Sequence, residues 1–143
     1  MVMSTEPGTV FPILLRHVRS GFGGAFGDGR QWMSWIHERD FVRAVAWLID
    51  RDDVAGPVNV TAPQPMPQRE FLRALRDAGG APFGLPVARW MLEIGAYFLR
   101  TDSELVLKSR RVVPGRLLDL GFGFDFPSWP AAARDLVARR RGT

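Results

Sequence analysis

The sequence predicts a soluble α/β domain, because helices of amphipathic spacing alternate with short apolar runs of strand-like composition. The chain has 143 residues, of which 46% are hydrophobic and 24% charged, a balance typical of one globular domain. The stretch 29–40 organises the rest: a glycine-rich loop leads into a strand-like run, and an amphipathic helix follows.

That stretch reads GRQWMSWIHERD. Trp32 to His37 predicts a strand, since two indoles and an isoleucine are separated by small or polar residues. Asp40 is predicted to cap the next helix, because its carboxylate can accept from the free N–H groups of the first turn. Two tryptophans, a histidine and an arginine then meet at one strand-to-helix joint, which is the best functional clue in the chain.

The remaining elements follow from periodicity and from glycine and proline positions. Short strands are predicted at Val58–Val60 and Phe122–Phe124, and three prolines predict a loop over 61–67. The glycines at 79 and 80 end a helix and separate a predicted domain of residues 1–80 from one of residues 81–143. Helices are predicted over 9–20, 41–50, 68–77, 87–99, 103–109, 114–120 and 128–139.

Composition excludes several classes of site and partner. The absence of cysteine removes thiolate metal sites, disulfides and cysteine nucleophiles. The net charge is +4, but the arginines are spread along the chain, so we expect no nucleic-acid partner. The N-terminus does not resemble a signal peptide, and the apolar run Val10–Leu15 is too short to span a bilayer. We therefore expect a cytoplasmic protein with no membrane partner.

Local motifs give no complete catalytic centre. His17 and His37 are twenty residues apart, which disfavours a histidine metal site. His37 and Asp40 can form a proton relay, or His37 can be hydrogen-bonded at a strand end beside a capping carboxylate. The loop Gly21–Gly29 is not a phosphate cradle, because it follows a helix and precedes a strand, the reverse of the dinucleotide fingerprint.

Two groups of motifs resemble a known family. The first is Gly29-x-Gln-Trp-Met-Ser-Trp-Ile-His-x-x-Asp40, with Gly56-Pro-Val-Asn-x-x-Ala-Pro63 after it. The second comprises Glu104-Leu-x-Leu107, Ser109-x-Arg-Val-x-Pro-x-x-Leu117 and Gly121-Phe-x-Phe124. Both resemble the NAD(P)-dependent epimerase-like extended short-chain dehydrogenases, in the "epimerase family" subgroup that ends in a small domain of unknown function.

The resemblance covers only the C-terminal half of that family. It implies the last part of a Rossmann-like fold, with few parallel strands and helices, followed by a small, mostly helical domain. The glycine-rich fingerprint and the Tyr-x-x-x-Lys pair are missing from this sequence, and Tyr97 has no lysine four residues on. NAD or NADP is implied for a full-length member, whereas this chain alone is expected to bind neither and to be inactive.

The resemblance also implies the wall that faces a small-molecule substrate. We expect that wall to contain Arg30, Gln31, Trp32, Trp35, His37 and Arg111. Met33 occupies a position where nucleotide-sugar epimerases often carry a phosphate-binding arginine, which disfavours a nucleotide-sugar substrate. The alternative for the two tryptophans is a place in the core, and for Asp40 it is a cap.

Two functions therefore remain open. The chain is either the C-terminal fragment of an epimerase-like oxidoreductase, whose missing N-terminal half is its partner, or a non-catalytic module that binds or self-associates. The apolar segment Val87–Leu99 motivates the second, because a helix that is apolar nearly all round is buried or forms an interface.

Overall fold

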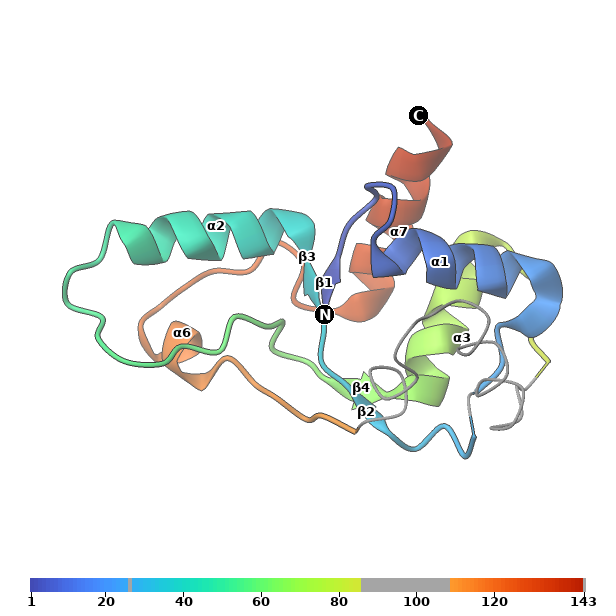
Figure 1. Cartoon of the computed structure of the whole chain (residues 1–143), viewed down its shortest axis with the longest axis horizontal. Coiled ribbons are helices and arrows are strands. Elements are labelled where there is room, and N and C mark those ends of the chain that lie inside the picture. The colour runs from blue at the N-terminus through green and yellow to red at the C-terminus, as the bar shows by residue number, and fades with distance from the viewer. Residues whose placement is uncertain (26, 86–108, 143) are drawn as a thin grey trace.

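A computed structural model describes residues 1–25, 27–85 and 109–142. Helices joined by long loops make up most of this part, and two pairs of very short strands lie between them (Figure 1). The predicted α/β class is confirmed. The predicted helix 87–99 lies outside the described residues, as does all of the predicted helix 103–109 except Ser109.

The strands form two separate sheets. β1 (Val2–Met3) pairs in parallel with β3 (Ile36–His37), with Met3 opposite His37. β2 (Trp32–Met33) pairs antiparallel with β4 (Met66–Pro67). The prediction of one strand from Trp32 to His37 is therefore wrong, because the chain passes from one sheet to the other at Ser34 and Trp35.

Three further strand predictions need correction. Met66–Pro67 was expected in a loop but forms β4, whereas Val58–Val60 and Phe122–Phe124 form no strand. A strand requires a neighbour for its backbone groups, and these two segments instead supply side chains to a small apolar cluster around Ala44 and Leu117.

The helices agree better with the predicted ranges. α1 (Val10–His17) continues into a π-helical turn, Val18–Phe22, in which Gly21 adopts a φ of +87°. α3 (Gln68–Gly79) ends at Gly80, whose φ of +72° is the left-handed conformation that favours glycine at a helix end. The other helices are α2 (Glu38–Ile49), α6 (Gly115–Asp119) and α7 (Trp129–Arg141).

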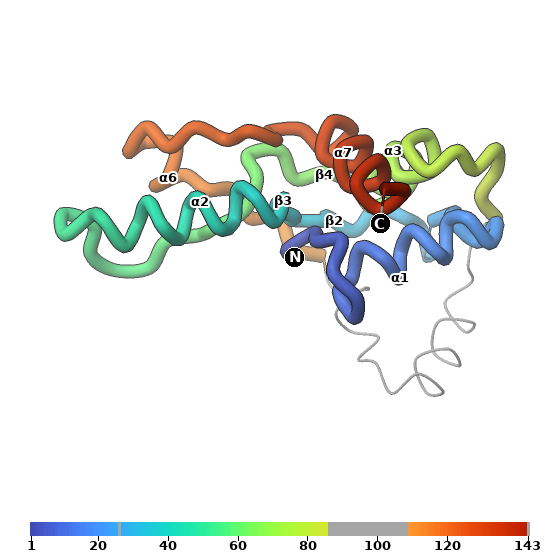
Figure 2. The backbone as a smooth tube through the Cα atoms, turned by 90° about the horizontal axis from the view of Figure 1, so that it is seen from above, coloured from blue at the N-terminus to red at the C-terminus, as the bar shows by residue number. Residues whose placement is uncertain are grey.

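The main core lies where α1, α3 and α7 meet (Figure 2). The Trp129 ring stacks on Phe71 at a centroid distance of 3.9 Å and meets Trp35 edge-on at 5.1 Å. Its indole N–H also donates to the Phe71 carbonyl at 2.8 Å, which satisfies the one polar atom of a fully buried ring. The last helix thus completes a core begun by the first eighty residues, and the division at residue 80 stays a prediction.

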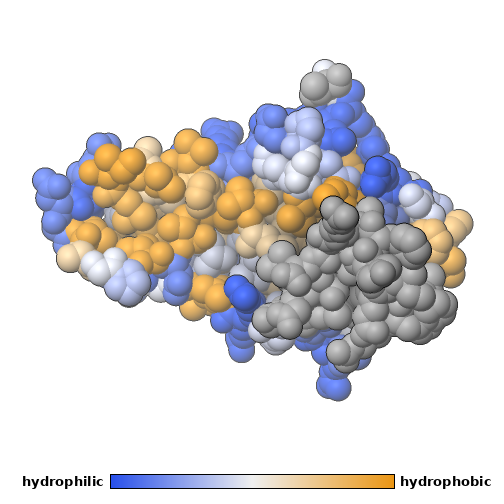
Figure 3. All heavy atoms as spheres, in the orientation of Figure 1, coloured by the Kyte–Doolittle hydropathy of each residue, from blue (hydrophilic) through white to orange (hydrophobic). Residues whose placement is uncertain are grey.

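The helix α2 is much less covered than its sequence pattern predicted. Ala44 is fully buried, but Val42 is 65% exposed and Ile49 is 74% exposed. Apolar side chains gather over α2 on the face shown in Figure 3. The amphipathic spacing of this helix predicts a buried face that includes Val45, Leu48 and Ile49. Leu48 packs against the cluster around Ala44, whereas Val45 is 36% exposed and Ile49 faces solvent.

Candidate functional site

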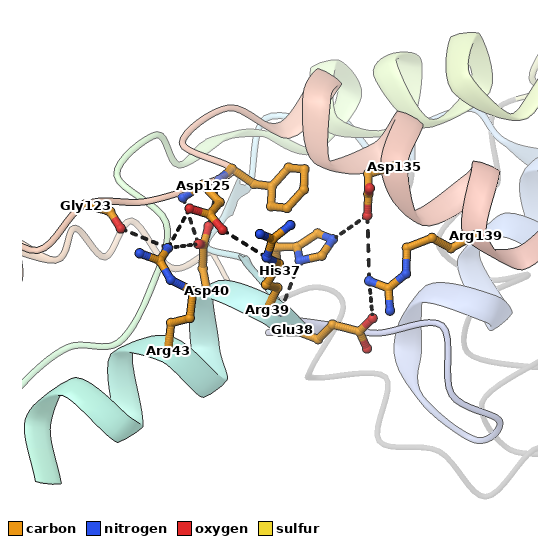
Figure 4. A network of polar contacts seen from close by, with 10 residues as sticks. His37, Glu38, Arg39, Asp40, Arg43, Gly123, Asp125, Asp135 and Arg139 are labelled. Atoms are coloured by element: carbon orange, nitrogen blue, oxygen red, sulfur yellow. Dashed lines mark hydrogen bonds and ion pairs between the residues drawn. The ribbon is translucent and has the colours of Figure 1, made fainter.

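The joint before α2 is built around His37, which is completely buried. Its Nδ1 accepts the backbone N–H of Arg39 at 3.1 Å and so caps α2. Its Nε2 lies 3.1 Å from an Asp135 carboxylate oxygen on α7, and the ring stacks on Phe126 at 4.0 Å (Figure 4). Because Nδ1 is an acceptor, the neutral ring carries its proton on Nε2 and donates it to Asp135.

Burial lowers the pKa of His37 below its ordinary value of 6.5, although the Asp135 carboxylate acts in the opposite direction. The imidazole is therefore neutral at neutral pH. Arg139 extends the contact, reaching Glu38 at 2.8 Å and Asp135 at 3.7 Å. The arrangement holds the start of α2 against α7.

Asp40 does not cap α2, so that prediction is wrong. The helix begins at Glu38, three residues before its predicted start at residue 41, with His37 as its cap. Asp40 lies fully buried in the first turn. Its Oδ1 accepts the N–H of Asp125 at 2.8 Å, and its Oδ2 accepts the N–H of Phe126 at 2.8 Å. Arg43 donates to Asp40 at 3.2 Å and to Asp125 at 2.8 Å.

His37 is hydrogen-bonded at the end of β3, as one sequence interpretation expected, but not beside a capping Asp40. Its carboxylate partner is Asp135, 98 residues away, rather than Asp40. Asp40 in turn holds the segment that leads into α7. No local signal could have identified Asp125 or Asp135, since both pairings join opposite ends of the chain.

A second group of contacts surrounds Trp32. The Arg111 guanidinium lies 4.4 Å from the centroid of the Trp32 ring, a cation–π arrangement. The Trp32 N–H donates to the Ser109 hydroxyl at 3.0 Å, and its carbonyl accepts the Arg110 N–H at 3.0 Å. The Ser34 hydroxyl donates to the Arg110 carbonyl at 2.6 Å and accepts the Val112 N–H at 2.8 Å. We call residues 109–112 the docked segment.

The predicted site residues thus fall into two sets. Trp32 and Arg111 contact each other on a surface that Gln31 and Arg30 adjoin along the chain, and Arg30 is exposed. Trp35 lies in the core with no exposed surface, where its indole N–H donates to the Gln64 carbonyl at 3.1 Å. His37 is equally buried.

Other features of the described part of the chain add no catalytic centre. Within residues 1–25, 27–85 and 109–142, no group of three His, Asp or Glu side chains is placed to hold a metal. No helix there is long and apolar enough to cross a membrane. A groove of about 430 Å³ between α3 and α7 is lined by alanine, proline and charged side chains and contains none of the predicted site residues.

Comparison with known proteins places this fold. A domain of unknown function, DUF1731, matches residues 87–136. An epimerase family protein of Bacillus subtilis, YfhF, is 31% identical over 98% of this chain and 45% of its own length. A Staphylococcus aureus epimerase family protein, SAR0825, is 32% identical over similar shares. The chain therefore spans about half the length of the curated relatives it matches.

Solved structures of an epimerase family protein and of an epimerase also resemble this chain. Human epimerase family protein SDR39U1, crystallised with NADPH, has a TM-score of 0.84 and 27% identity, over 96% of this chain and 45% of the human chain. A nucleoside-diphosphate sugar epimerase from Corynebacterium glutamicum shares the fold with a TM-score of 0.69 and 24% identity, over 99% of this chain and 27% of its own.

The fold is thus that of the C-terminal part of an epimerase-like short-chain dehydrogenase. The chain matches the C-terminal part of epimerase family proteins, and its residues 87–136 match DUF1731.

Proposed function

We propose that this chain supplies the substrate-side wall of an NAD(P)-dependent, epimerase-like oxidoreductase that acts on a small molecule. The observation that carries the proposal is the contact between Trp32 and Arg111. It joins the motif before α2 to the docked segment, in a chain related to a protein crystallised with NADPH. Arg30 and Gln31 extend this wall along the chain.

Trp35 and His37 support the wall from behind. Trp35 is packed in the core against Trp129, and His37 is held between Phe126 and Asp135. Both side chains are fully buried, so we assign them the role of fixing the backbone from which Trp32 projects. Direct substrate contact is assigned to the exposed or half-buried side chains.

The described residues do not fit the cofactor's phosphates. The glycine-rich loop lies between the π-helical turn and β2, whereas a pyrophosphate is held where a strand ends and a helix begins, by the free N–H groups of that helix. We therefore expect this chain alone to bind no NADPH and to perform no hydride transfer. A fluorescence titration of the chain with NADPH should show no saturation.

The wall itself is tested in a chimera in which this chain replaces the matched C-terminal part of the Bacillus subtilis relative. The chimera should bind NADPH and oxidise it with members of a panel of small carbonyl compounds. Trp32→Ala should lower kcat/KM for those compounds without changing NADPH affinity, while Arg16→Gln, an exposed change on α1, should leave both unchanged. Equal kcat/KM in the Trp32→Ala chimera would remove Trp32 from the wall.

The second candidate function, a binding or self-association module, is favoured by the exposed apolar face of α2. Val42 and Ile49 on α2 are largely exposed, and Leu118 on α6 is 47% exposed; exposed apolar side chains that gather on one face are typical of interaction surfaces. Size-exclusion chromatography with light scattering tests it. Self-association that Val42→Glu and Ile49→Glu abolish would support this function, and a well-folded monomer would contradict it.

A further inference from the structure

We propose that Arg111, whose guanidinium lies over the Trp32 ring, is the recognition group for an oxyanion, a carboxylate or a phosphate, on the substrate. The inference rests on the proposed function, because it names the chemical class of the molecule that the wall faces. Three features of the surface support it: a backbone held by hydrogen bonds, a guanidinium over an indole ring, and a positive charge with no ion-pair partner among the described residues.

The backbone that carries Arg111 is fixed on both sides. The preceding residue, Arg110, bonds through its N–H to Trp32 and through its carbonyl to Ser34. The following residue, Val112, donates its N–H to the same Ser34 hydroxyl at 2.8 Å. The Ser34 hydroxyl thus uses both its donor and an acceptor on the docked segment, which makes Ser34 a positioning residue for Arg111.

The guanidinium is oriented by the indole. At 4.4 Å from the ring centroid, Arg111 lies over the Trp32 face. The planar fork of guanidinium N–H groups matches the two oxygens of a carboxylate or phosphate. Because the contact with the indole restricts the long side chain before any ligand arrives, less conformational entropy is lost when the ligand binds.

The positive charge here has no carboxylate partner in the part of the chain that the structure describes. Elsewhere Arg43 and Arg51 pair with aspartates at 2.8 Å, and Arg139 pairs with Glu38 at the same distance. Arg110 and Arg111 have no such ion pair among the described residues. The field of Arg110 also contributes, after burial, to lowering the pKa of the nearby Met1 amine. Such a surface attracts anions.

The experiment follows the Trp32 indole N–H resonance of the intact chain by NMR while inorganic phosphate or sodium acetate is added at constant ionic strength. Saturable shifts are expected with at least one anion. Arg111→Gln should weaken that binding by about tenfold, which corresponds to ~1.4 kcal/mol. Arg111→Lys should recover only part of it, since an ammonium keeps the charge but loses the planar fork. Ser34→Ala should weaken binding less than Arg111→Gln does.

The control is Arg16→Gln, which removes one exposed positive charge from α1 and should leave the affinity unchanged. Saturation with phosphate alone assigns a phosphate-bearing substrate, and saturation with acetate assigns a carboxylate. Linear shifts with both anions, or equal weakening in the Arg16→Gln control, would overturn the proposal. Anion binding that depends on Arg111, in a chain whose chimera shows no NADPH turnover, would uphold the inference and remove the proposed function.

Discussion

Removing the Asp40 charge should be among the most destabilising polar changes in this chain. The carboxylate is fully buried and accepts two backbone N–H groups at 2.8 Å. Asp40→Asn keeps the shape but turns an NH₂ group toward one of those donors. One charge-assisted hydrogen bond is then lost, and the new amide NH₂ group faces a buried backbone N–H, which is also a donor. Since hydrogen bonds to charged groups contribute about 1.5–3 kcal/mol each, we expect a loss of ~2–4 kcal/mol.

The assay is urea unfolding followed by tryptophan fluorescence, with the free energy of unfolding extrapolated to water for each variant. Asp53→Asn is the matched control, because Asp53 pairs with Arg51 at 2.8 Å in an ion pair whose aspartate is 63% exposed. Such exposed pairs contribute little to stability, because water and salt screen the attraction. If Asp40→Asn costs no more than Asp53→Asn, with the same m-value, then Asp40 does not hold the segment before α7 and our account of the joint fails.

Three further predictions concern stability. Burial lowers the pKa of His37 in the folded state, so the unfolded chain binds more protons at acid pH. Stability should therefore fall as the pH drops below about 6.5. Urea unfolding at several pH values should show a smaller fall for the His37→Gln variant. Gly29→Ala should cost more than Gly27→Ala. Both glycines have positive φ, but a Cβ at Gly29 would lie 2.6 Å from the Ala25 Cβ. A Cβ at Gly27 would have no heavy atom of the described residues within 4 Å, its chain neighbours aside. Equal melting temperatures for the two variants would contradict this prediction. Trp129→Phe should cost ~1–3 kcal/mol, because it removes a buried hydrogen bond to the Phe71 carbonyl and leaves a cavity where the larger ring was. A loss below the error of urea unfolding would refute this.

The sequence predicted helices well where amphipathic spacing and a glycine agreed. α3 and its end at Gly80 are the clearest case, since both signals are local. Family motifs also located the joint before α2. Strands were predicted poorly because a strand is defined by its neighbour: Val58–Val60 has apolar strand composition, yet its side chains pack in a cluster with α2.

The polar contacts of the joint before α2 could not be predicted from the sequence either, because their partners are also distant in the chain. Asp40 looked like a cap because its residue type and spacing fit one, but His37 occupies that position and Asp40 bonds a segment 85 residues away. The sequence around Asp135 does not distinguish it from an ordinary solvent-exposed aspartate on a helix. Trp32 and Arg111 were both predicted as wall residues, and their contact emerged only when the docked segment was seen beside β2.

The position of Trp129 in the core has a consequence for synthesis on the ribosome. Phe71 and Trp35 both pack against Trp129, which is synthesised 58 residues after Phe71. Until α7 leaves the exit tunnel, it cannot cover those rings. The nascent chain then exposes apolar surface that chaperones can bind. A premature stop before Trp129 would leave that surface uncovered, so we expect the truncated product to be degraded by proteases.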